Sequence, residues 1–177
     1  MGLMERTAME PTIVERDQIL LAGFSFFGDP FAASGGWTEE NEIGRLWARF
    51  FAYLEQHSRE IPPTAVRDTS YELHITHDET SEKGHYEVFV GIHCPTIEGL
   101  PPQLSVKVLP AGEYATATLR GPEITSDWAQ RIYQEWLPEA GYGQVHDFMY
   151  ELYDQRFKGL DQLEDSEVDI YIPIRPL

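Results

Sequence analysis

The chain has 177 residues, of which 42% are hydrophobic and 12% aromatic, enough to bury the core of one ordinary domain. Its 30 acidic and 13 basic residues give a formal net charge of −17, which repels nucleic-acid phosphates and anionic lipid and attracts cations. We therefore expect no direct binding to nucleic acid or membranes, although solubility alone is an alternative explanation of the charge. The single cysteine, Cys94, excludes an intrachain disulfide, and the sequence lacks a signal-peptide pattern, so we expect a cytoplasmic protein.

The first half of the chain predicts two strands, a helix and two further strands. Residues 1–10 are expected to form a flexible lead-in, and residues 11–177 a single domain. Strands are predicted at 12–16 and 19–27, rich in β-branched and aromatic residues, and alternating strands at 71–77 and 86–92, joined by a polar hairpin loop. Between them, with Thr38 or Asn41 as N-cap, six apolar residues follow the spacing of an amphipathic helix: Ile43, Leu46, Trp47, Phe50, Phe51 and Leu54.

The second half repeats this order. Strands are predicted at 104–109 and 114–119, then a turn at Gly121, a helix that ends between Pro138 and Gly141, and strands at 148–154 and 168–174. The segment Tyr-Glu-Leu at 150–152 matches Tyr-Glu-Leu at 71–73. The repeat predicts an α+β fold of two β-α-β-β halves, about 11–94 and 104–177, related by a pseudo-twofold axis. Antiparallel sheets, two main helices and a central ligand groove are expected.

Glu151 is the residue that points to function, because it lies at the centre of a predicted buried strand rich in aromatics. Ionised carboxylates are costly to bury without a positive partner. Alternation places Met149, Glu151 and Tyr153 on one face, and Tyr171 is expected beside Glu151 across an antiparallel pair. A cationic ligand would suit this cluster. Two alternatives are solvent exposure of Glu151, or its pairing with one of three arginines: Arg16, Arg131 and Arg156.

The histidines and the cysteine give only weak evidence of a metal or a nucleophile. Four histidines lie close in sequence, but His74 and His77 are three apart on a strand and so point to opposite faces. Pro95 directly follows Cys94, which indicates the end of a strand, and nothing marks a lowered thiol pKa. No metal and no cofactor is expected.

The ordered motifs identify a family resemblance. They are PTIVER at 11–16, the helix at 43–51, LPAGEY at 109–114, WLPEAG at 136–141, YELYD at 150–154 and DIYIPI at 169–174. In these the chain resembles the GyrI-like small-molecule-binding domain, the effector-binding domain of drug-sensing transcription activators. The resemblance implies a duplicated fold with a central groove in which Glu151 meets cationic aromatic ligands. Because the sequence shows no helix-turn-helix domain, we expect a stand-alone module, with a separate transcription regulator as a possible partner.

Three functions follow, in order of preference. The first is binding of lipophilic cationic or aromatic compounds. The second is hydrolysis of electrophilic, cyclopropane-type aromatic natural products. In this reaction Glu151 would act as general base on a water molecule, and Tyr153 would orient the water or donate a proton. The third is protein-binding inhibition of DNA gyrase. The aromatic helix residues are more often core than pocket, and the loop at 30–37 is either a plain connection or a cover for the groove. The expected ligand-binding residues are Glu151, Tyr153, Tyr171, Met149, Trp47, Phe51, Phe89 and Trp136.

Overall fold

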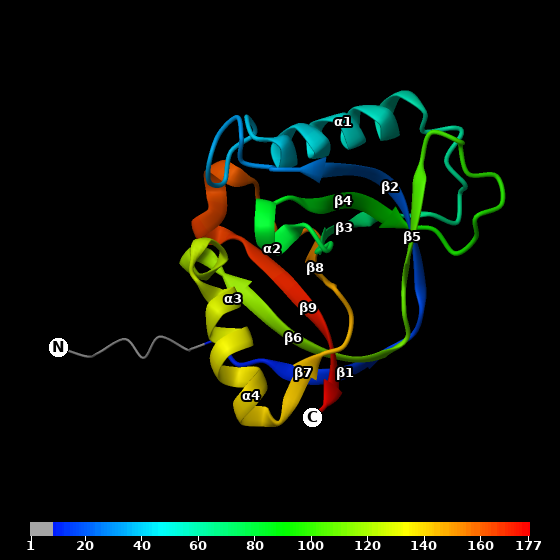
Figure 1. Cartoon of the computed structure of the whole chain (residues 1–177). Helices are drawn as coiled ribbons and strands as arrows, with labels where there is room; N and C mark the ends of the chain where they lie inside the picture. Colours follow the sequence, from blue (N-terminus) through cyan, green and yellow to red (C-terminus); the bar gives the residue numbers. More distant parts are fainter. Residues whose placement is uncertain (1–8) are drawn as a thin grey trace.

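The computed structural model describes residues 9–177, so most of the expected lead-in at 1–10 lies outside the described residues. The first half begins with two strands that lead into a helix whose N-cap is Asn41, one of the two predicted caps. The hairpin loop between the next two strands contains one short helical turn. The elements are β1 (Thr12–Arg16), β2 (Ile19–Gly28), α1 (Glu42–Gln56), β3 (Val66–Ile75), α2 (Thr80–Lys83) and β4 (Tyr86–His93) (Figure 1).

The second half differs from its prediction mainly in the helix, which is built from several pieces. A 3₁₀ turn precedes it, and its middle is a π-helical segment in which the Leu137 N–H reaches the carbonyl of Ile132. This wider turn comes just before Pro138, which has no N–H to donate, and the helix ends at Gly141 with φ 77°. The elements are β5 (Ser105–Leu109), β6 (Gly112–Arg120), η1 (Gly121–Thr125), α3 (Trp128–Gln130), η2 (Arg131–Trp136), α4 (Leu137–Ala140), β7 (Tyr142–Gln144), β8 (Phe148–Tyr153), η3 (Leu160–Asp165) and β9 (Glu167–Pro176).

The strand order confirms the predicted duplication. Within residues 9–177 all nine strands join one antiparallel sheet in the order β1-β6-β9-β8-β3-β4-β2-β5, with β7 added on β9. The series β2-β4-β3 of the first half is mirrored by β6-β9-β8 of the second, and the two series meet where β3 pairs with β8. A pseudo-twofold axis therefore runs between β3 and β8.

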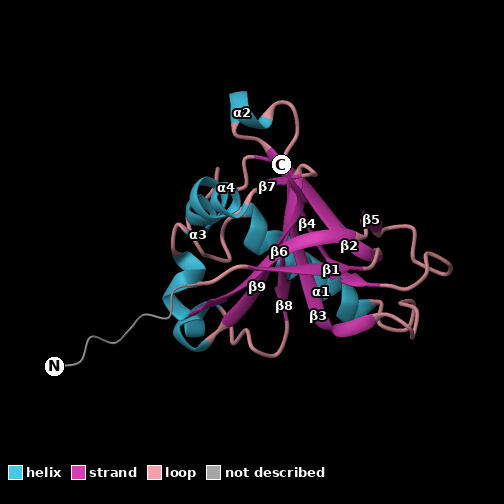
Figure 2. Ribbon diagram, turned by 90° about the horizontal axis from the view of Figure 1, so that it is seen from below, coloured by secondary structure: helices cyan, strands magenta, loops and turns pink. Residues whose placement is uncertain are grey.

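The sheet curls because the strand pairs β1–β6 and β2–β5 at its two ends continue one another in a single antiparallel ladder. Thr12 pairs with Thr116 and Arg16 with Gly112 in β1 and β6, and the same register continues from Ile19 to Gly23 in β2 and β5. Since β1 leads into β2 and β5 leads into β6, this ladder links the two ends of the strand order. Figure 2 shows the strands crossing one another instead of lying in one plane.

The two faces of the curled sheet carry different cores. On the outer face α1 packs Leu46 and Phe50 against β2 and β4, and the second helical region packs Ile132 and Leu137 against β6 and β9. The inner face is filled by aromatic and aliphatic side chains, among them four tyrosines and Phe89. We call α1 and the second helical region, from η1 to α4, the two helical covers. Strands β3 and β8 thus lie between them. None of the helices in the described part of the chain has the length and hydrophobicity of a membrane span, and the cytoplasmic location stays a prediction.

Candidate ligand-binding site

Two buried glutamates lie opposite each other where the two halves meet, in the pair formed by β3 and β8. Glu72 on β3 and Glu151 on β8 are register partners, and only 5% and 4% of their surfaces are exposed. Their neighbours in the next strands are Val90 on the Glu72 side and Ile170 on the Glu151 side. Two carboxylates are therefore adjacent in a sheet row whose other members are aliphatic, where burial makes ionisation costly.

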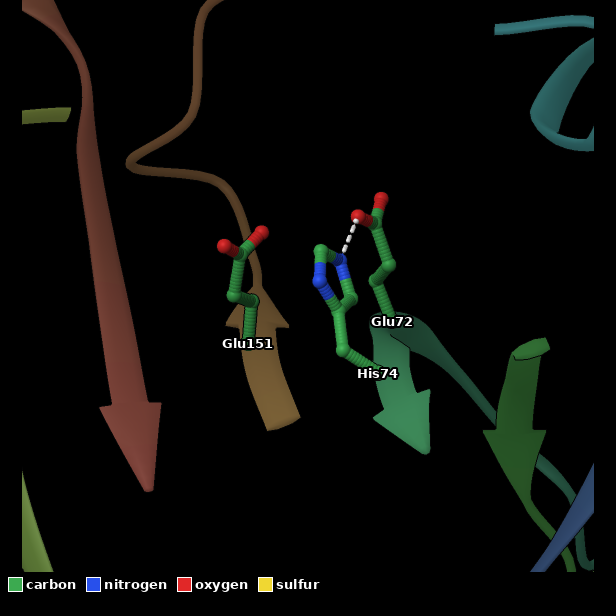
Figure 3. Close-up of side chains that lie close together, drawn as sticks. All are labelled: Glu72, His74 and Glu151. Carbon is green, nitrogen blue, oxygen red and sulfur yellow. Dashed lines mark hydrogen bonds and ion pairs between the residues drawn. The ribbon is translucent and has the colours of Figure 1, made fainter. Parts of the chain in front are cut away.

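Each glutamate accepts a hydrogen bond from the side chain two residues further along its own strand. His74 Nε2 lies 2.6 Å from Glu72 Oε1, and the Tyr153 hydroxyl donates to Glu151 Oε2 at 2.5 Å. In Figure 3 the imidazole of His74 lies between the two carboxylates. Trp47 on α1 adds a third donor, with its Nε1 2.5 Å from Glu72 Oε2. Glu72 is therefore held by two donors, one of which can become a cation, whereas Glu151 has one neutral donor.

The pKa values of this cluster reflect burial and mutual repulsion. Burial, followed by the charge of Glu72, raises the pKa of Glu151 to about 7. Burial on its own would lower the pKa of His74, but the hydrogen bond and charge of Glu72 raise it overall, with a smaller contribution from Glu151. The pKa of Tyr153 is also raised, by burial and then by Glu151, so this hydroxyl keeps its proton. Glu151 is thus a group that exchanges a proton near neutral pH.

No arginine or lysine within residues 9–177 forms an ion pair with Glu151, which excludes the internal pairing considered from the sequence. Arg16 lies on the inner face, 4.9 Å above the ring of Tyr171. Arg156 binds Asp154 and Asp169 instead. The carboxylate is also not in bulk solvent, since it is almost fully buried.

A cavity of about 1040 Å³ opens beside the glutamate pair, between the two helical covers. Five segments enclose it: the loop before α1, α1 itself, β3, the helical region after β6, and the end of β8 with the chain that follows it. Three large apolar side chains of its wall remain well exposed, Phe51 at 52%, Phe31 at 44% and Trp37 at 40%. Its main lining side chains are Phe31, Trp37, Trp47, Phe51, Glu72, His74, Ile124, Trp128, Glu151, Tyr153, Phe157 and Leu160.

Of the eight expected site residues, the structure brings four together in this cavity: Trp47, Phe51, Glu151 and Tyr153. Trp47 stacks on Phe51 at 5.4 Å between ring centroids and meets Tyr153 edge-on at 5.2 Å. These three rings form a continuous aromatic wall next to Glu151. The loop at 30–37 contributes Phe31 and Trp37 to the wall, and the side chain of Asn41 holds it by donating to the carbonyl of Gly36.

The other four expected residues lie outside the cavity wall. Tyr171 and Phe89 are wrong as wall residues because they point to the inner face; Tyr171 pairs with Tyr150, and Glu151 pairs with Ile170. Met149 shares the face of Glu151 but is buried in the core beneath the second helical region. Trp136 packs against that same core and borders a separate hollow of about 150 Å³.

Glu72 and His74 belong to the site although the sequence analysis did not include them. The repeated Tyr-Glu-Leu segment contained the signal, because equivalent residues of two halves meet at a twofold axis. Glu72, His74 and Glu151 also offer one ligand atom each within 4.8 Å of one another, a spacing that a metal ion can use. The hydrogen bond between Glu72 and His74 accounts for much of this spacing without an ion.

The comparisons with known proteins agree with this fold and cavity. Residues 12–174 match the family model Cass2, described as integron-associated effector binding protein. The chain belongs to this family. A curated relative, the transcriptional regulator BrlR of Pseudomonas aeruginosa, is 33% identical over 171 residues. The match covers 94% of this chain and 56% of BrlR, so this Cass2-family chain spans about half the length of that regulator.

Two solved structures share the fold of this Cass2-family chain. SAV2435 bound to tetraphenylphosphonium superposes with a TM-score of 0.66 at 14% identity, and 94% of each chain is covered. The C-terminal domain of EcmrR has a TM-score of 0.65 at 14% identity, with 97% of this chain and 100% of that domain covered. Together with the family match, they confirm the GyrI-like fold that the sequence motifs predicted.

Proposed function

We propose that this Cass2-family domain binds lipophilic aromatic cations in the cavity between its helical covers. The observation that carries the proposal is Glu151, a buried carboxylate that faces an aromatic cavity and has no cationic partner of its own. Such a carboxylate supplies the counter-charge that a desolvated cation needs. The net charge of −17 draws cations toward the protein, within about 8 Å at physiological salt.

The preference for an aromatic ligand rests on the cavity wall. Trp47, Phe51 and Tyr153 present ring surfaces beside the carboxylate, and each ring face attracts a cation by about 0.5 to 2 kcal/mol. Phe31 and Trp37 leave exposed apolar surface that a flat ligand would cover. Tetraphenylphosphonium, the compound bound to the structural neighbour SAV2435, has this combination of rings and charge and is a suitable probe.

The test is a calorimetric titration of tetraphenylphosphonium into the wild-type protein and Glu151→Gln at about pH 8. The substitution keeps the shape of the side chain and removes its charge, so we expect at least tenfold weaker binding, about 1.4 kcal/mol. Glu39→Gln is the matched control, since Glu39 lines the cavity but is exposed, and solvent screens its charge. Equal affinities of the wild type and Glu151→Gln would contradict the proposal, as would no binding by the wild type.

Hydrolysis is the second candidate because of the environment of Glu151. A general base works best with a pKa near the working pH, and burial with repulsion by Glu72 raises that of Glu151 to about 7. Tyr153 holds one oxygen of the carboxylate and leaves the other for a water molecule. Hydrolysis of a cyclopropane-containing electrophilic aromatic compound should then rise with pH around 7 and disappear in Glu151→Gln. Equal rates with and without the protein would remove this candidate.

Regulation of transcription would require a DNA-binding unit besides this domain. The match to BrlR covers 56% of that regulator, which leaves room in it for another domain. We propose that this domain reports ligand binding to such a unit, either on a separate partner or in a longer chain. Inhibition of DNA gyrase stays an untested prediction.

A further inference from the structure

We infer that a permanent cation entering the cavity displaces a proton from the cluster formed by Glu72, His74 and Glu151. The domain would then take up its ligand by exchange for a proton, and its affinity would follow pH. This inference rests on the proposed function, because it concerns how the same site receives a cation.

The geometry of the cluster favours retention of a proton when no ligand is bound. One ligand atom from each of the three side chains lies within 4.8 Å of the others. Only His74 can carry positive charge, and it is bonded to Glu72. With both carboxylates ionised, the cluster would hold an uncompensated negative charge between Val90 and Ile170. A proton neutralises that charge and occupies almost no volume.

The groups around the cluster do not supply the missing positive charge. The one arginine of the cavity wall, Arg67, directs its guanidinium to the carbonyls of Ser58 and Ile61. Tyr86 on β4 lies with its ring 5.6 Å from that of His74, and burial, then Glu72 and Glu151, raise its pKa to about 12. The remaining titratable groups of the wall are acidic or phenolic: Glu39, Asp68, Tyr153 and Asp154.

Glu151 is the member of the cluster that would release the proton. Its pKa is raised to about 7 by burial and by Glu72, while Tyr153 holds its proton far above that range. A permanent cation beside the carboxylate acts in the opposite direction to Glu72 and lowers the pKa of Glu151. The Glu151 proton then leaves to solvent, and the carboxylate remains paired with the bound cation.

Calorimetry in several buffers measures this exchange. Tetraphenylphosphonium carries no proton of its own, so the slope of binding enthalpy against buffer ionisation enthalpy counts the protons released by the protein. From a pKa of about 7 we expect about 0.9 proton released at pH 6, about 0.5 at pH 7 and about 0.1 at pH 8. The apparent affinity should fall about fivefold from pH 7 to pH 6.

Variants identify the source of the proton. Glu72→Gln removes the charge that repels the ionised form of Glu151, so release at pH 7 should fall well below the wild-type value. Glu55→Gln, at an exposed position of α1 that does not line the cavity, should leave it unchanged. Binding with an enthalpy independent of buffer at pH 6 would overturn the exchange and leave the proposed function standing. No binding of tetraphenylphosphonium at any pH would overturn both.

Discussion

His74 and Tyr153 occupy equivalent positions in the two halves, and each donates a hydrogen bond to the glutamate two residues before it on the same strand. Glu72 and Glu151 are themselves register partners across the pseudo-twofold axis. The backbone arrangement is thus symmetric, but the donors are not, because an imidazole can become a cation and a phenol cannot. This difference leaves Glu151, rather than Glu72, without a cation bonded directly to it.

Replacing the neutral donor by a cationic one should therefore block the site. In Tyr153→His, an imidazolium beside Glu151 would neutralise the carboxylate, and we expect at least tenfold weaker binding of tetraphenylphosphonium at about pH 6. Tyr153→Phe is the matched control: it removes the hydroxyl but adds no charge. Its affinity at about pH 8 should stay within about threefold of the wild type. Calorimetry that finds both variants equally weak would assign the loss to packing instead of charge.

The free energy of unfolding should fall as pH rises from about 5 to about 8. Above the ordinary value of 4.5 the unfolded chain loses the Glu151 proton, whereas the folded chain keeps it up to about pH 7. The unfolded state therefore binds fewer protons, and stability decreases by about 2 to 3 kcal/mol over this window. The raised pKa of His74 acts in the same direction, since its stabilising charge is lost as pH rises through that pKa.

Urea unfolding at the two pH values measures this change, and Glu151→Gln provides the comparison. The variant should lose much of the pH dependence and be more stable than the wild type at about pH 8. Glu87 and Asp154 do not disturb the comparison, because their pKa values are lowered and their contributions are lost only at more acidic pH. An undiminished pH dependence in the variant would show that other groups cause it.

Asn41 should couple helix α1 to the loop that contributes to the cavity wall. Its side-chain oxygen accepts from the N–H of Gly44 as the N-cap of α1, and its amide nitrogen donates to the carbonyl of Gly36. Asn41→Ala removes both bonds and should cost about 1 to 2 kcal/mol of stability. Asn41→Asp keeps the cap but loses the donor to Gly36. If thermal unfolding finds Asn41→Asp as stable as the wild type, the loop bond contributes nothing.

The close pairing of β2 with β4 should depend on Gly23, which lies opposite Gly91 of β4. A Cβ atom at Gly23 would lie 1.8 Å from the carbonyl oxygen of Val90, and a backbone carbonyl cannot rotate away. Gly23→Ala should therefore destabilise the fold by about 3 kcal/mol or more, or prevent folding. Gly35→Ala is the control, because nothing lies within 4 Å of its added methyl group. Equal melting temperatures of the two variants would contradict this.

Local patterns were sufficient to predict the main elements and their repetition, but not the short elements α2, β7 and η3 or the start of β3 at Val66. The apolar stripe from Ile43 to Leu54 predicted α1, and Asn41 was one of two proposed caps. Alternation correctly separated the aliphatic face of β9, with Ile170 and Ile172, from the face that holds Tyr171. These patterns are properties of a short segment, since helix and strand periods depend only on backbone geometry.

The pairing of strands was the part that local patterns could not provide. Tyr171 was expected beside Glu151, but the register places Tyr150 opposite Tyr171 and turns Glu151 to the other face. A shift of one residue in register moves a side chain to the opposite face, and each strand taken alone, with apolar side chains on both faces, leaves the register open. For the same reason the sequence did not place Glu72 in the site, although the repetition of its Tyr-Glu-Leu segment is evident.

The sequence by itself determined the duplicated β-α-β-β plan, the two helical stripes and an acidic residue at 151 in a strand of aromatics. Only the tertiary structure decided that a second glutamate lies opposite the first, that a histidine holds one and a tyrosine the other, and that the wall includes the loop before α1. The physical reason is that the two glutamates are about 80 positions apart in the sequence, so strand register and helix packing across the whole domain decide which groups surround each of them.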